Sequence, residues 1–373
     1  MTKNKKELSY WMALAHLEKI RLKRKHDLIL QIISQDHSII DFFHQDLTTW
    51  KDKYKLNSKE IDLLNEAKSE LANNSFLIED LLEQGYNIIP ILSKDYPDIL
   101  KKKLKFSRAP LLLYIKGDKQ LLKDSAVAIV GSRSASQKSL RFTNTIAKKV
   151  CDQNKVVVSG YAKGVDRQAL VSAINFKGKS IIVLPQGITT FKSGFKKYYK
   201  HIINGDVLVS SIFHPNVPWS PQNAMARNPI IYGLAGEIYV AESNEKGGTW
   251  SGVIDGLRKG HKIYIRKPSQ REKNANLLLI EKGAIPVDDN GKILKNEIQT
   301  REKNKKIYDE KILELLKKKP LTSKDIIKNL NLSLTQRNVT DYLKNHPKII
   351  TLNKHKPLKF KLKNDKFKQK KII

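Results

Sequence analysis

The sequence predicts an α/β protein: a Rossmann-like, mostly parallel sheet, preceded by a small helical domain and followed by a winged-helix domain. The apolar runs at 126–130 and 156–158 each end in a glycine-rich turn, and a stretch with helical spacing follows each turn. After these turns, strand-like runs keep alternating with helical segments of about 10 to 15 residues. Because parallel strands need such crossover helices, the alternation indicates a doubly wound domain.

Residues 1–85 are expected to form a small helical (SAM-like) domain. Apolar residues recur there at helical spacing, and Asn57 followed by Ser58 has the chemistry of a helix N-cap. From residue 86 the pattern changes to short apolar runs at 87–92 and 111–116, which are bounded by turn residues. We expect these two runs to join or flank the edge of the following sheet.

The Rossmann-like domain is assigned to residues 86–290. Its later strands are expected at 180–184, 207–210, 237–242 and 262–265. A polar linker is expected at 291–304. Three amphipathic helices and two alternating segments then occupy 305–363, which is the winged-helix order. The end of the chain, 364–373, is expected to be a basic, disordered tail.

The third helix of the winged-helix domain is predicted to face a DNA groove. It would expose Gln336, Arg337 and Lys344 to the nucleic acid. Modules of this kind also serve as protein contacts, which is the alternative here.

The composition is strongly basic, with 70 Lys and Arg against 37 Asp and Glu and a formal net charge of +33. Such an excess favours a polyanion, above all nucleic acid, as the partner. The alternative is a basic bias spread along the whole chain. Residues 301–373 hold 22 Lys and Arg against 7 acidic residues, so part of the charge is concentrated.

Several classes of protein are disfavoured. The single cysteine, Cys151, excludes an internal disulfide framework. No apolar run reaches the ~20 residues of a membrane span, and no apolar signal segment follows the N-terminus. The nine histidines are scattered, with no HxxxH or HxH pair. We therefore expect a cytoplasmic protein without membrane contact, metal or cofactor.

The turns after the two central strands are expected to form a phosphate-binding pocket. Their small and basic residues are Gly131, Ser132, Arg133, Ser159, Gly160, Lys163 and Gly164. Glycine lets the backbone approach an anion, a helix N-terminus offers free N–H groups, and the basic side chains add positive charge. A third such junction, Gly247, Gly248 and Thr249, opens the helix after 237–242. The alternative is a set of ordinary tight turns with solvated basic residues.

Asp166, Glu242 and Glu245 are the acidic residues near these turns that could act in catalysis. The simpler interpretation is structural: Asp166 would cap a helix, and Glu242 would orient a basic residue of the pocket.

Four motifs resemble those of the DNA-processing protein A (DprA/Smf) family. They are AVAIVGSRSAS at 126–136, VVVSGYAKGVD at 156–166, ARNPIIYGLA at 226–235 and VAESNEKGGTWSG at 240–252. Together with DYP at 95–97 and APLLLYIKGD at 109–118, they cover roughly residues 86–287. The family commonly has His where Leu170 stands and Arg where Pro229 stands, which indicates a divergent member.

The resemblance implies a non-enzymatic protein that binds single-stranded DNA in the Rossmann-like pocket. It also implies a homodimer that helps to load the recombinase RecA during natural transformation of competent cells. The residues it assigns to DNA are Arg133, Ser159, Gly160, Lys163, Gly164, Arg227 and Asn228, with Lys192 as a looser match. Gly247, Gly248 and Thr249 stand where the family more often has a Ser-Gly-Ser type of turn.

Two alternatives of other classes stay open. One is a phosphoribohydrolase that cleaves nucleoside monophosphates; in such enzymes a glutamate follows the related turn, whereas Trp250, Ser251 and Gly252 follow Thr249 here. The other is a nucleotide-sensing module, which would bind a mononucleotide tightly and no DNA. We favour the DNA-binding protein.

Overall fold

The computed structural model describes residues 3–332, 336–352 and 357–363. The chain divides into two compact units, Met1–Leu294 and Lys295–Ile373. In the described part of the first unit, nine strands form one sheet in the order β1-β2-β6-β5-β4-β3-β7-β8-β9. They are β1 (Asn87–Pro90), β2 (Leu112–Lys116), β3 (Ala126–Val130), β4 (Val156–Ser159), β5 (Ser180–Val183), β6 (Val207–Ser211), β7 (Glu237–Val240), β8 (Ile263–Arg266) and β9 (Ile285–Val287).

The sheet is parallel except at one edge, where β1 and β2 are antiparallel. The prediction that 87–92 and 111–116 join the edge is therefore confirmed. β3 lies between β4 and β7, with Ala128 paired to both Val158 and Ile238. Strands β3, β4, β5 and β6 follow one another both along the chain and across the sheet. The next strand, β7, then pairs on the opposite side of β3. The topological switch point, where such sheets bind ligands, thus lies between the carboxyl ends of β3 and β7.

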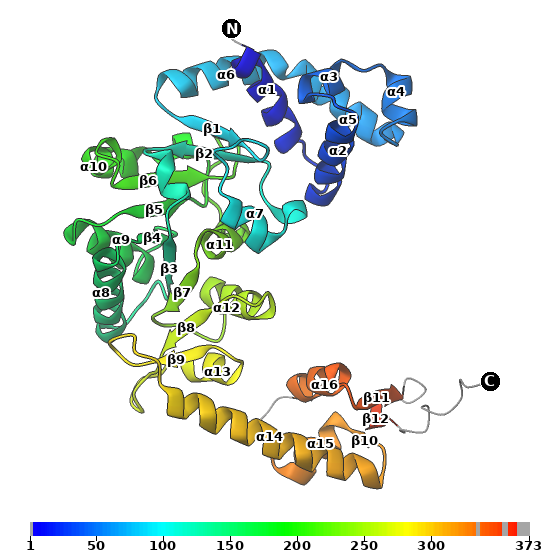
Figure 1. Ribbon diagram of the computed structural model, residues 1–373, viewed down its shortest axis with the longest axis vertical. Helices are drawn as coiled ribbons and strands as arrows, with labels where there is room; N and C mark the ends of the chain where they lie inside the picture. The colour runs from blue at the N-terminus through cyan, green and yellow to red at the C-terminus, as the bar shows by residue number, and fades with distance from the viewer. Residues whose placement is uncertain (1–2, 333–335, 353–356, 364–373) are drawn as a thin grey trace. The chain divides into compact units, whose positions relative to one another are not determined.

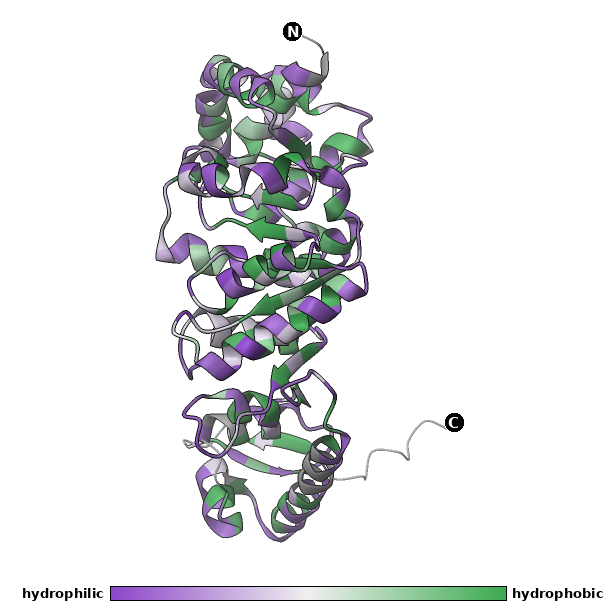
Figure 2. Ribbon diagram, turned by 90° about the vertical axis from the view of Figure 1, so that its left-hand side faces the viewer, coloured by the Kyte–Doolittle hydropathy of each residue, from purple (hydrophilic) through white to green (hydrophobic). Residues whose placement is uncertain are grey.

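Helices cover both faces of this sheet, α8 and α9 on one face and α11 to α13 on the other (Figure 1). They are α8 (Gln137–Asp152), α9 (Val165–Asn175), α10 (Lys192–Ile203), α11 (Pro221–Leu234), α12 (Gly248–Arg258) and α13 (Asn276–Glu281). Side chains of β3 alternate between the two cores: Ala128 packs in the core that contains α11, and Ile129 in the core that contains α8 and α9. Figure 2 shows the strands as largely apolar, while the helices carry hydrophilic stretches. The doubly wound α/β prediction is confirmed.

The N-terminal helices pack against the sheet in the core that also contains α11. They are α1 (Lys3–Ala15), α2 (Leu22–Ser34), α3 (Ile39–His44), α4 (Leu47–Asp52), α5 (Ser58–Ser69) and α6 (Leu71–Glu83), and α7 (Asp98–Leu104) follows β1. Asn57 caps α5 in a reciprocal capping box with Glu60, as the sequence predicted. His16 in the segment after α1 forms a 2.8 Å hydrogen bond with the buried Tyr114 hydroxyl of β2. Helices and sheet therefore form one unit.

The second unit contains three helices and a small antiparallel sheet within its described residues. They are α14 (Lys295–Lys318), β10 (Leu321–Thr322), α15 (Ser323–Leu330), α16 (Gln336–Asn345), β11 (Ile349–Leu352) and β12 (Lys359–Leu362), with sheet order β10-β12-β11. The predicted linker at 291–304 is in large part helical, because α14 begins at Lys295. The linker was predicted from the polarity of this stretch. Its polar residues include Lys, Glu and Gln, which favour a helix, so polarity is not evidence for a loop here. The predicted tail at 364–373 lies outside the described residues.

Candidate functional site

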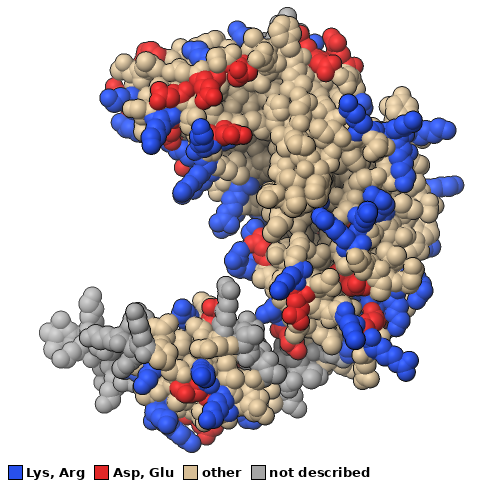
Figure 3. Space-filling view, turned by 180° about the vertical axis from the view of Figure 1, so that it is seen from behind, with Lys and Arg blue, Asp and Glu red and all other residues tan. Residues whose placement is uncertain are grey.

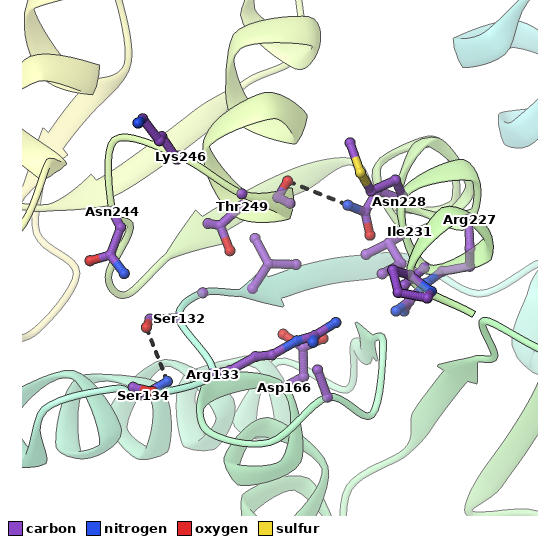
Figure 4. A pocket seen from close by; sticks show the side chains of 18 of the residues that line it. Ser132, Arg133, Ser134, Asp166, Arg227, Asn228, Ile231, Asn244, Lys246 and Thr249 are labelled. Carbon is purple, nitrogen blue, oxygen red and sulfur yellow. Dashed lines mark hydrogen bonds between the residues drawn. The ribbon is translucent and has the colours of Figure 1, made fainter. Parts of the chain in front are cut away.

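A pocket of about 380 Å³ opens at the switch point, within the ordinary size range of ligand sites. Four segments form it: the turn after β3, the start of α9, one side of α11, and the turn between β7 and α12 (Figure 4). On α11, Pro221, Ala224, Met225 and Asn228 line the pocket with the spacing of one helix face. The pocket thus lies where the topology places a ligand.

The first glycine turn does not offer a free helix N-terminus. The Glu242 carboxylate accepts hydrogen bonds from the Ser136 backbone N–H (3.0 Å), the Ser136 hydroxyl (2.7 Å) and the Ser139 hydroxyl (2.7 Å) at the start of α8. Glu242 is buried, and its own backbone oxygen accepts from the Ser132 N–H at 2.8 Å. Glu242 therefore compensates the dipole of α8, and the expectation that it orients a basic residue of the pocket is wrong.

The second glycine turn is also occupied by a carboxylate of the chain. Asp166 is buried in the first turn of α9, where the N-cap is Gly164 rather than an acidic residue. Burial raises the pKa of Asp166, while Arg227 and hydrogen bonds from the backbone N–H groups of Ala162, Gly160 and Gly131 act in the opposite direction. Asp166 thus ties the turns after β3 and β4 together. It lies inside the helix rather than at the cap that the sequence suggested.

The third glycine turn, by contrast, is open. The N-cap of α12 is Gly247, whose φ of 101° favours glycine, and no side chain caps this helix. Among the described residues, no acceptor meets the backbone N–H groups of Gly248 and Thr249, and both residues line the pocket. Asn228 holds the turn by donating to the Gly248 carbonyl at 3.3 Å. The positive end of an 11-residue helix therefore faces the pocket without a protein anion.

Three cationic side chains line the same pocket. Arg133 and Lys246 are exposed and make no hydrogen bond or ion pair within the part of the chain that the structure describes. In Figure 4, Arg133 extends from the turn after β3 toward the side of the pocket where Arg227 lies. This arrangement leaves two cations available to an anion that enters from solvent.

Arg227 is 3% exposed, and its Nη1 donates to the Val183 carbonyl at 2.9 Å, while its Nε has no partner among the described residues. Burial lowers the pKa of Arg227 to about 10; Asp166 raises it and Arg133 lowers it. Arg227 therefore stays charged at neutral pH. A Cβ on Gly160 would lie 1.7 Å from Nη1, so the glycine of the second turn makes room for this guanidinium.

The structure brings most, but not all, of the predicted residues to the pocket. Those that line it are Gly131, Ser132, Arg133, Arg227, Asn228, Gly247, Gly248 and Thr249. Those that do not are Ser159, Gly160, Lys163, Gly164 and Lys192. Ser159 is buried and donates to the Ile129 carbonyl at 2.7 Å, and a Cβ on Gly164 would lie 2.3 Å from the Ser132 carbonyl oxygen. These two residues pack the turns together, while Lys163 and Lys192 are exposed outside the pocket.

Sequence reasoning missed several polar residues of the lining, among them Lys246 and Asn244, and it did not place Asp166 in the pocket. Lys246 directly precedes the third glycine turn, so its basic charge next to Gly247 was a usable signal. In the second unit, Gln336 and Lys344 are exposed at the two ends of α16. The side chain of Arg337 lies outside the described residues, and DNA contact by this helix stays a prediction.

In the described ranges, no group of three or more His, Cys, Asp or Glu side chains is placed to hold a metal ion. No helix there combines the length and apolar character that crossing a bilayer requires.

The fold and the pocket define a doubly wound α/β protein with a pocket at its switch point that three cationic side chains line. Residues 87–297 match the family model for DNA recombination-mediator protein A. Because the match covers more than half of the chain, the protein belongs to this family, the DprA/Smf family, and the resemblance noted in its motifs is confirmed.

Individual relatives agree with this assignment. The chain is 32% identical over 208 residues to the DNA processing protein DprA of Bacillus subtilis, covering 54% of this chain and 68% of that protein. It is 29% identical over 223 residues to protein Smf of Escherichia coli, covering 58% of each. The crystal structure of DNA processing protein A from Streptococcus pneumoniae superposes with a TM-score of 0.56 at 25% identity, over 75% of this chain and 94% of that one. The chain thus matches between about half and two thirds of its curated relatives' lengths.

Proposed function

We propose that the protein is a non-enzymatic recombination mediator that binds single-stranded DNA by holding a backbone phosphate in the pocket at the switch point. One observation carries the proposal: the N-terminus of α12 is free of any protein anion and faces the same cavity as Arg133 and Lys246. The turns after β3 and β4 are filled by Glu242 and Asp166. Among the described residues that line this pocket, the start of α12 is therefore the place where an external anion can meet free backbone N–H groups.

The contacts available in the pocket favour a strand over a specific sequence. Backbone N–H groups, a guanidinium and an ammonium recognise phosphate, which is the same at every nucleotide. Such binding is tolerant of sequence and strongly salt-dependent.

The charge of the surface supports the proposal less than the pocket does. Figure 3 shows Lys and Arg side chains spread over the visible face instead of gathered in one patch. This spread agrees with the alternative of a general basic bias, although it would still attract a polyanion. The proposal therefore depends on the pocket.

An enzymatic role is disfavoured by the state of the nearby acids. Glu242 is fully engaged by Ser136 and Ser139, and Asp166 is buried against backbone N–H groups. Glu245 is exposed and does not line the pocket. A phosphoribohydrolase needs a free carboxylate at the bound nucleotide. Asp166 lines the pocket, but backbone N–H groups donate to its carboxylate, and after Thr249 the chain has Trp250 and Ser251.

The test is fluorescence anisotropy with labelled oligo-dT over a series of salt concentrations, beside an assay for free base released from AMP. We expect binding that weakens steeply with salt and no release of adenine. Release of adenine would favour the hydrolase instead. Tight binding of a mononucleotide without binding of the strand would favour the sensing module.

The family membership also motivates two finer proposals: that the protein forms a homodimer, and that it loads RecA during natural transformation. Analytical ultracentrifugation of the full chain measures the first. The second predicts faster RecA assembly on DNA that is coated with single-strand binding protein. An unchanged assembly rate would contradict it.

A further inference from the structure

Trp219 is a large, half-exposed aromatic residue in the loop that leads into α11. It is 49% exposed, and it lies two residues before Pro221, the first pocket-lining residue of α11. Two residues of chain span at most about 7 Å, so the Cα of Trp219 lies within about that distance of the Cα of Pro221 at the edge of the cavity. Met225, which lines the pocket itself, is 56% exposed.

The backbone on both sides of Trp219 is fixed. Before it, the Gly187 N–H donates to the Val217 carbonyl at 2.7 Å, and the Thr189 hydroxyl donates to the Pro215 carbonyl at 2.6 Å. After it, Ser220 caps α11 by accepting from the Asn223 N–H at 3.0 Å. The loop thus holds an exposed indole on an anchored chain, an arrangement that costs little ordering entropy when a ligand stacks on it.

Trp219 differs from the other aromatic residues of this region. Tyr161 has edge contacts with Phe191 and Tyr198 and carries the Arg167 guanidinium over its ring. Trp250, in the first turn of α12, is partly buried against the main core. Within the described residues, no ring or cation pairs with the indole of Trp219, and about half of this side chain is exposed to solvent.

We propose that Trp219 stacks on a nucleobase of the strand whose phosphate occupies the pocket. The inference rests on the proposed function and adds base contact to it. Stacking on an indole is tolerant of sequence, because every base has a π-face, so it agrees with phosphate-directed binding. The protein would then distinguish a nucleic acid strand from other polyphosphates that carry no bases.

A double cycle, in which both the protein and the DNA strand are varied, tests the proposal. Wild type and Trp219→Ala are titrated with oligo-dT and with an abasic strand of equal length, which keeps the phosphates and sugars but lacks bases. We expect wild type to bind oligo-dT about tenfold more tightly than the abasic strand, and Trp219→Ala to bind both alike. Affinity for the abasic strand should be equal in the two proteins. Tyr199→Ala serves as the matched control, since Tyr199 is 61% exposed on α10 and does not line the pocket.

Tryptophan fluorescence supplies a second readout: oligo-dT should quench wild type and should quench Trp219→Phe less. A preference for oligo-dT that survives Trp219→Ala would overturn the inference, as would equal binding of both strands by wild type. In those cases salt-dependent binding would still stand, and with it the phosphate pocket. If wild type binds neither strand, the proposed function fails and the stacking role fails with it. A variant that changes only self-association in sedimentation would show Trp219 to be a protein contact instead.

Discussion

The hydroxyl of Ser136 donates a 2.7 Å hydrogen bond to the Glu242 carboxylate, which lies 106 residues further along the chain. This contact fills the N-terminus of α8, the helix that follows the first glycine turn. Asp166 instead accepts hydrogen bonds from backbone N–H groups of the turns after β3 and β4. A carboxylate of the chain thus occupies the N-terminus of α8, whereas among the described residues none occupies the N-terminus of α12 at Gly248, which faces the pocket.

Glu242→Ala should destabilise the protein and open a second anion site. The substitution removes charge-assisted hydrogen bonds to Ser136 and Ser139, which costs on the order of 1.5–3 kcal/mol in the free energy of unfolding. Sulfate should recover part of this loss by taking the place of the carboxylate at α8. Melting temperatures of wild type and variant in sulfate and in chloride measure this recovery. An equal response of the two proteins to sulfate would contradict the account.

Gly160→Ala should displace Arg227, because its Cβ would meet Nη1 at 1.7 Å. We expect weaker oligo-dT binding and a loss of about 1–3 kcal/mol in unfolding free energy, since the buried guanidinium loses its place by the Val183 carbonyl. Gly236→Ala is the matched control: its Cβ would lie 3.8 Å from the Ala126 oxygen, an ordinary contact. Wild-type affinity in folded Gly160→Ala would show that the position of Arg227 does not matter for binding.

Acid should destabilise the loop between β8 and α13, which contains Glu272. The hydrogen bond from Arg266 lowers the pKa of Glu272 to about 2 from its ordinary 4.5. Because the pKa of Glu272 is lower in the folded protein than in the unfolded chain, its contact with Arg266 stabilises the fold above about pH 4.5. This contribution to the free energy of unfolding, about 3 kcal/mol, is lost as the pH falls toward 2. Urea unfolding of wild type and Glu272→Gln should differ at pH 7, and the difference should shrink between pH 4.5 and pH 2. A difference that is independent of pH would refute the assignment.

A chain ending at Leu294 should fold and keep the pocket. The core clusters of the first unit end at Val287, and the second unit has its own core around Ile326 and Phe360. Oligo-dT affinity should fall mainly at low salt, because the basic segment 301–373 is lost. Calorimetry and solubility check the fold; an aggregated fragment would mean that the first unit needs the second.

Local patterns in the sequence predicted most of the fold. Apolar runs located β3 and β4, and the cap residue Asn57 located the start of α5. The three-residue strand β9 and the two-residue strand β10 were missed, because such short runs give no periodic signal. Both form only through pairing with distant segments.

The pocket itself was predicted in part. The glycine turns and Arg133 were visible as motifs, but the turns look alike in sequence. Which of them is open depends on contacts such as Glu242 with Ser136, and no local pattern reports a pairing over 106 residues. Lys163 illustrates the limit: it lies in a glycine turn, yet its side chain is outside the cavity.

The affinity of Arg133→Ala for oligo-dT, measured with its melting temperature on one preparation, tests the central claim most directly. Arg133 has no partner within the described residues, so the melting temperature should be unchanged. Losing one charge-assisted phosphate contact should weaken binding roughly ten- to a hundredfold, and Arg133→Lys should restore only part, since an ammonium lacks the two-point geometry of a guanidinium. Arg141→Ala, an exposed arginine on α8 outside the pocket, should bind like wild type. Unchanged affinity in Arg133→Ala would contradict a phosphate site in this pocket.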